Sequence, residues 1–267
     1  MKHNFIPIVL LPLLFSCGGA SSESGINSDV WKKEVDIFGI AIKATDCVSD
    51  AKIQHAANVM AEYLDNNNDG VVDNSAVLDA LKKNVNRNFV GMTCESDDIY
   101  AAGIALFSYE THPNGSSVDG GFDATLEEIL HLITEKGYAI AYPLVFAERE
   151  GSSIANSMDT ARGSVKGGGK PLSDYPADAW YTYSDKSCDY SCMVTEYFYW
   201  GLTSILGAQS YSGRLDQIEE EWDLNTEAKV KATDPTLYDL LTDSKYKLPT
   251  RIPDGTYAGT TLTIVRK

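Results

Sequence analysis

The chain has 267 residues and a formal net charge of −16, from 38 acidic and 22 basic side chains. Nucleic-acid binding calls for clustered basic residues, so this charge argues against a nucleic-acid partner, and it also disfavours anionic lipid head groups as partners beyond a covalent anchor. With 43% hydrophobic residues, including 15 Tyr and 4 Trp, the chain has enough apolar side chains to bury a sizeable core.

The N-terminal segment has the features of a bacterial export signal. Lys2 precedes an apolar run from Phe5 to Phe15. That run is too short for a transmembrane helix and has the length of the apolar part of a signal peptide. The following LLFSC, residues 13–17, resembles the lipobox of bacterial lipoproteins. The resemblance implies that residues 1–17 form the lipoprotein signal and that Cys17 carries the acyl chains, palmitate among them.

The residue after the cysteine bears on the destination of the protein. Gly18 stands where an Asp would favour retention in the inner membrane, so the resemblance implies a cell-envelope protein that is lipid-anchored in the outer membrane. An ordinary signal peptide cleaved nearby is the alternative, and it also predicts export. Residues 18–29 are small and polar, which indicates a flexible tether. Residues 30–267 then form a single globular domain.

The patterns along this domain predict a mainly helical α+β fold with a small strand component. Period-two alternation predicts a strand over 35–42, and residues 99–109 fit either a helix or a strand. Helical periodicity predicts helices over about 50–64, 75–85, 122–136, 193–207 and 215–224. We expect Thr125 and Glu128 to form a capping box and Gly137 to end that helix. Residues 151–176 are predicted to be a long loop that acts as a mobile lid.

Residues 65–76 resemble the calcium loop of EF-hand and dockerin proteins. Gly70 stands at the sharp turn, and oxygen-bearing groups occupy the ligand positions: Asp65, Asn67, Asp69, the main chain of Val71, and Asp73. The final bidentate Glu is replaced by Ala76, so the resemblance implies a weak Ca²⁺ site. An Asn/Asp-rich turn without an ion is the alternative.

Four cysteines remain once Cys17 is set aside. An even number in an exported protein indicates two disulfides, and we favour the pairs Cys47–Cys94 and Cys188–Cys192. A zinc site with four thiolates is the alternative, but the spacing lacks paired C-x-x-C motifs.

Acidic residues on two predicted helices carry the strongest signal for chemistry. Glu127 and His131 are four residues apart, which puts them on one face of a helix with Glu128 close by. Glu196 lies in the very apolar segment 193–200, where burying a carboxylate is costly unless a cation or hydrogen-bond donors offset it.

This arrangement resembles the zinc helices of gluzincin-type zincin metallopeptidases, over the two helices within 123–207 only. The resemblance implies a zincin-like domain in which Glu127, His131 and Glu196 hold Zn²⁺ and Glu128 is the general base. Glu127 stands where the family has a His, and its negative charge leaves the catalytic activity open. The alternative is a chance match on a solvated helix face.

Other residues extend this hypothesis. His112 is a spare ligand candidate, and Tyr138, Tyr142 and Tyr190 are candidates for stabilising an oxyanion. The leading hypothesis is an exported lipoprotein with a zinc-dependent, hydrolase-like site for a peptide or protein substrate. The alternative is a non-catalytic, calcium-binding surface lipoprotein that binds a partner or a carbohydrate.

The lipobox predicts the effect of removing its cysteine. A Cys17→Ser variant has no thiol to acylate, so we expect it to move from the membrane fraction to the soluble fraction. Cell fractionation and mass spectrometry of the N-terminus measure this. Equal membrane association of parent and variant would contradict the anchor.

Overall fold

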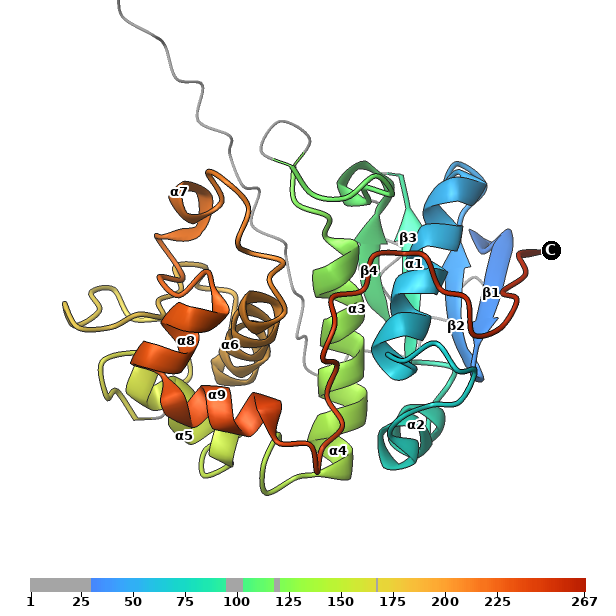
Figure 1. Cartoon of the computed structure of the whole chain (residues 1–267). Coiled ribbons are helices and arrows are strands. Elements are labelled where there is room, and N and C mark those ends of the chain that lie inside the picture. Colours follow the sequence, from blue (N-terminus) through green and yellow to red (C-terminus); the bar gives the residue numbers. More distant parts are fainter. Residues whose placement is uncertain (1–29, 95–102, 118–120, 167) are drawn as a thin grey trace, which may run out of the picture.

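The computed structural model describes residues 30–94, 103–117, 121–166 and 168–267 (Figure 1). The export signal, Cys17 and the tether lie outside these ranges. The described residues form an α+β fold, in which a mixed sheet and its covering helices are followed by a second group of helices around α6 (Tyr190–Ile205). None of the described helices is long and apolar enough to cross a membrane.

The sheet has five strands in the order β4-β3-β2-β1-β5. Strands β2 (Ile40–Ala44), β3 (Phe89–Thr93) and β4 (Ile104–Phe107) run parallel to one another. The flanking β1 (Lys33–Ile37) and β5 (Val265–Arg266) are antiparallel to their neighbours. The strands are short, which agrees with the small strand component predicted. In the apolar segment 99–109, which fitted a helix or a strand, the described part contains β4.

The predicted strand over 35–42 is wrong, because this segment is a hairpin. Phe38 and Gly39 have φ values of 54° and 90°, the left-handed conformation that a tight two-residue turn requires. Val35 and Ile37 on one strand and Ile40 and Ile42 on the other are all fully buried. The buried positions shift by one residue across the turn, and the apolar Phe38 hides this shift in the sequence pattern.

Helices α1 (Asp50–Leu64) and α3 (Thr125–Ile133) lie side by side and pack against the sheet (Figure 1). The remaining helices are α2 (Ser75–Lys82), α4 (Ala139–Ala141), α5 (Ser153–Ala161), α7 (Leu215–Ile218), α8 (Glu227–Thr233) and α9 (Pro235–Thr242). The predicted helix over 215–224 is thus shorter, and the predicted lid over 151–176 contains α5, which contacts α6. Ser157 and Tyr197 hydrogen-bond at 3.0 Å across that contact.

Both predicted ends of the α3 helix are wrong. Thr125 is a helical residue that makes no cap, and the N-cap residue is Ala124. The helical conformation does not end at Gly137, because a π-helical turn over Thr134–Tyr138 leads into α4. A Cβ on Gly137 would lie 2.7 Å from Val77 of α2, so glycine is needed there for close packing and not for termination.

The C-terminal segment, residues 243–267, runs from α9 across α3 and α1 to β5 (Figure 1). Glu62 of α1 holds it by accepting hydrogen bonds from the backbone N–H groups of Asp254, Gly255 and Thr256 at 3.0, 2.8 and 3.1 Å. The chain therefore closes on its own first strand, through a contact that no local pattern predicts.

The four cysteines form the two pairs favoured from the sequence, Cys47–Cys94 and Cys188–Cys192. The first pair links the segment after β2 to the end of β3. The second lies at the start of α6, where Asp189 caps the helix by accepting from the Cys192 N–H at 3.0 Å.

Candidate metal centre

Three side chains predicted from the sequence meet between α3 and α6. One ligand atom each of Glu127, His131 and Glu196 lies within 4.8 Å of the other two. The Nε2 atom of His131 is 3.7 Å from Glu127 and 3.5 Å from Glu196. Within the described ranges, this is the one group of three His, Cys, Asp or Glu residues that meets so closely. His112, the spare candidate, is not part of it.

The position of α3 is fixed by polar contacts at its start. Asp123 precedes the helix, is buried, and binds His55 of α1 at 2.7 Å. Its other oxygen accepts the N–H groups of His112 and Thr125 at 3.0 and 3.3 Å. Asp123 thus accepts a hydrogen bond at the start of α3, the role that the sequence predicted for Thr125. Its contact with His55 also connects α3 to α1.

On the α6 side, an aromatic contact holds His131 in place. The Tyr199 ring lies edge-on to the imidazole at 5.8 Å between centroids. The Tyr199 hydroxyl accepts a hydrogen bond from Gln209 at 3.1 Å, and Gln209 accepts one from Arg214 at 2.7 Å. These buried contacts restrict the ring, so the imidazole has little freedom to turn away from the two carboxylates.

Charge at the site is balanced around His131. Burial alone would lower the pKa of His131, but Glu196, Glu127 and Glu128 together raise it well above its usual value. Burial raises the pKa of Glu196, and the neighbouring His131 partly opposes this. Without another cation, a protonated imidazole is the counter-ion of these carboxylates. A divalent cation supplies the same positive charge and takes the place of protons.

Glu128 is the most enclosed acid of the group, with only 1% of its surface exposed. Its Oε1 atom accepts no hydrogen bond from the described residues. Burial raises the pKa of this carboxyl well above the usual value, and the nearby Glu127, Glu110 and Glu196 add to the rise. An acid of this kind takes up a proton readily.

Further carboxylates surround the site, and sequence reasoning missed them. Burial, with the negative charge of neighbouring glutamates, raises the pKa of Glu110 and of Glu148 to about 7 and that of Glu221 to about 8. A pocket of about 150 Å³ borders Glu196, and its lining includes Glu135 and Glu148. These acids come from segments far apart in the chain, so no spacing in the sequence connects them.

The three tyrosines suggested for oxyanion stabilisation are not at the site. The Tyr138 hydroxyl donates to the Lys247 carbonyl at 3.1 Å, and the Tyr142 hydroxyl pairs with Asn74 at 3.2 Å. Tyr190 faces Asp159. Burial is the main cause of the raised pKa of the Tyr190 phenol, and the charge of Asp159 adds to it. Burial raises the pKa of the Tyr183 phenol, and the charge of Glu196 adds to the rise.

The calcium-type loop has the sharp turn predicted for it, with φ of 84° at Gly70. The buried Asp65 carboxylate accepts the Gly70 N–H at 2.8 Å and the Tyr257 hydroxyl at 2.6 Å. Asp69 accepts the Val71 N–H at 2.8 Å. Asp65 therefore anchors the C-terminal segment, a role that the sequence did not indicate. Calcium binding stays a prediction.

Comparison with known proteins gives no relative: no family model, no curated protein and no solved structure matches this chain. The geometry of the site is therefore the guide to its function.

The metal centre predicts a specific loss of binding. In a Glu196→Gln variant, the amide keeps the shape of the side chain but is a poor zinc ligand. We expect the parent to take up one equivalent of Zn²⁺. The affinity of the variant should fall by more than the roughly 10–100-fold typical of losing an outer-shell partner. Glu219→Gln, at an exposed site, is the matched control. Isothermal titration and elemental analysis measure the uptake; a parent that takes up no zinc would contradict the centre.

The loop predicts a thermal response to calcium. Free calcium about tenfold above its dissociation constant should raise the melting temperature by about 3–6 °C. Asp65→Ala combined with Asp69→Ala should abolish this rise. Tyr257→Phe is the control, because it removes the anchor hydroxyl and leaves the loop oxygens. Identical melting of the parent in calcium and in chelator would leave Asp65 with its anchoring role alone.

Proposed function

We propose that this protein is an exported lipoprotein whose α3–α6 interface is a zincin-like metal centre for hydrolysing peptide bonds. The observation that carries the proposal is the meeting of Glu127, His131 and Glu196 between α3 and α6. His131 is fully buried and Glu196 nearly so. Burying such charged groups without a strong partner is costly, and a bound cation offsets that cost.

The residues present fit a divalent ion. One imidazole and two carboxylates are donors that zinc accepts in proteins. Glu127, whose side chain is 20% exposed, lies toward the open side of the group. Two carboxylates leave more negative charge than the two imidazoles of the gluzincin pattern, which also suits harder ions such as Mn²⁺. Zn²⁺ is the ion that the resemblance favours.

A bound zinc ion would polarise a peptide carbonyl and make water more acidic. The chain's own part is proton transfer and positioning. Glu128 follows Glu127 on α3, and it is the carboxylate we assign to taking a proton from water and returning it to the leaving amine. Its enclosure keeps bulk water from competing for that proton. Tyr183 is the phenol we assign to stabilising negative charge on the carbonyl oxygen.

The alternative function is a calcium-binding surface lipoprotein without catalysis. The observation that favours it is the anchoring of the C-terminal segment by Asp65 and Glu62, which gives the loop a structural purpose. Both functions share the export signal and the lipid anchor at Cys17. They differ in whether the α3–α6 centre turns over a substrate.

The general base predicts a separation of binding from turnover. Glu128→Gln should retain zinc, because Glu128 is not among the three ligands, and should lower peptide hydrolysis about 10²–10⁴-fold. Zinc content and cleavage of a fluorogenic peptide library measure the two properties on one preparation.

The exposed Glu219→Gln variant should match the parent in both measurements. Equal loss of zinc and hydrolysis in Glu128→Gln would make Glu128 a structural or ligating acid. A zinc-loaded parent that cleaves no peptide would favour the non-catalytic function.

A further inference from the structure

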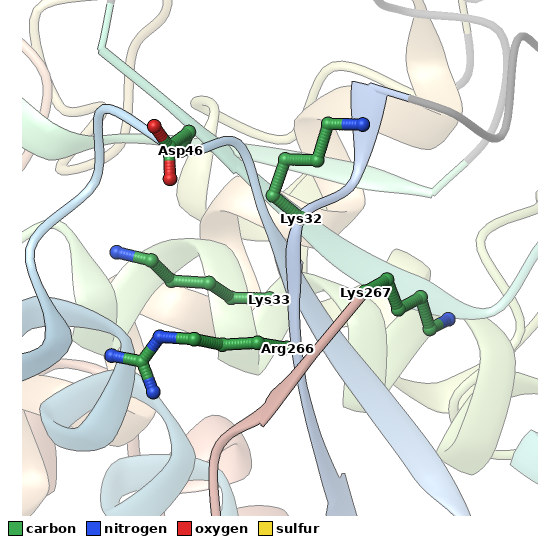
Figure 2. A pocket seen from close by; sticks show the side chains of 5 residues that line it. All are labelled: Lys32, Lys33, Asp46, Arg266 and Lys267. Atoms are coloured by element: carbon green, nitrogen blue, oxygen red, sulfur yellow. The ribbon is translucent and has the colours of Figure 1, made fainter.

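Basic side chains gather where the first and last strands of the sheet meet. Lys33 of β1 pairs in register with Arg266 of β5, and the Lys267 N–H donates to the Lys32 carbonyl at 3.0 Å. These four residues and Asp46 line a pocket of about 300 Å³ (Figure 2). We call Lys32, Lys33, Arg266 and Lys267 the basic end of the sheet.

The four cations point to two sides of the strand pair. Figure 2 shows Lys33 and Arg266 on the side of Asp46, and Lys32 and Lys267 on the other. This follows from strand alternation, because neighbouring residues face opposite sides of a sheet. No single small anion can touch all four. An extended anionic surface laid across the end of the strands reaches both sides.

The acids near the basic end do not hold its cations firmly. Arg266 and Lys33 share Asp50, and Lys267 pairs with Glu34. The side chains of Arg266 and Lys267 remain 61% and 54% exposed, and pairs this exposed contribute little stability. Lys32 is exposed and makes no ion pair among the described residues. Lys32, Arg266 and Lys267 can therefore exchange these acids for other anions. Lys33 cannot, because only 9% of its side chain is exposed and its ammonium also donates to the Val48 carbonyl.

The position of the basic end agrees with the proposed anchor. The described chain begins at Val30, two residues before Lys32, and residues 18–29 separate it from Cys17. A segment of that length reaches at most about 40 Å at full extension, so the anchor lies within that distance of Val30. The anchor would thus hold the basic end near the membrane at high local concentration, where even weak attraction orients a protein.

We propose that the basic end docks on the anionic phospholipid head groups of the membrane that holds the anchor; the inference rests on the proposed lipoprotein. The net charge of −16 disfavours contact between the protein as a whole and anionic lipid, and this small basic surface is the exception. The acidic remainder of the molecule is repelled by the same head groups, so the contact sets the orientation of the protein. In Figure 1 the C-terminus lies across the molecule from α8, so docking turns the α6 side away from the bilayer.

Binding to vesicles without the lipid tests the surface by itself. The probe is residues 18–267, which keep every contact described here, with folding checked by thermal melting. We expect co-sedimentation with vesicles of phosphatidylcholine and phosphatidylglycerol (about 7:3), little with phosphatidylcholine alone, and loss of binding at high salt. Lys32→Glu combined with Lys267→Glu should weaken binding about tenfold or more.

The matched control is Lys83→Glu with Arg87→Glu, which makes the same charge change at exposed residues after α2. Equal binding to both vesicle types, or equal loss in the two double variants, would overturn the docking surface. Inorganic phosphate that binds the probe in the absence of vesicle binding would also overturn it, in favour of a soluble anion. Because the probe carries no lipid, these outcomes are independent of the fractionation of Cys17→Ser.

Discussion

The packing of α3 against α6 depends on the charge that His131 shares with Glu127 and Glu196. Ion pairs buried in a protein interior cost several kcal/mol per ion in lost hydration, and they persist only where the geometry compensates. Here the compensation is an imidazole placed 3.7 and 3.5 Å from two carboxylates. Removing one partner would leave a buried charge without its counter-charge. The interface is therefore more sensitive to changes at these three residues than to changes in the apolar side chains around them.

The surroundings of this cluster are built to keep it rigid. α6 is held through Tyr197, whose hydroxyl donates to Asp234 at 2.5 Å, and through Tyr181, which donates to the Met193 carbonyl at 2.8 Å. α3 is held at its start by Asp123. Buried polar networks of this kind fix side-chain orientation when all members are satisfied. The three donor atoms are thereby preorganised, which is what a metal centre requires.

Sequence reasoning predicted the meeting of Glu127, His131 and Glu196 because the signals for it were local or chemically conspicuous. Glu127 and His131 have helical spacing, and Glu196 is a single acid in an apolar helix. It failed where position depends on contacts between distant segments: Glu221 and Tyr183 reach the site through loops, and Glu62 holds residues nearly 200 positions later. Most helices were predicted because apolar periodicity reports burial directly. The hairpin at Phe38 and Gly39 was missed because the apolar Phe38 hides the point where the alternation changes phase, between Ile37 and Ile40.

The distribution of charge links the two proposed sites. The acids gather around α3 and α6, where Glu110, Glu148 and Glu221 have raised pKa values because each is buried near others of the same sign. The basic end lies at the edge of the sheet farthest from β4, which contacts α3. A molecule with such separated charge has a preferred orientation in the field of an anionic membrane. In the two functions proposed here, this one separation of charge would serve both the docking of the basic end and the binding of a cation between α3 and α6.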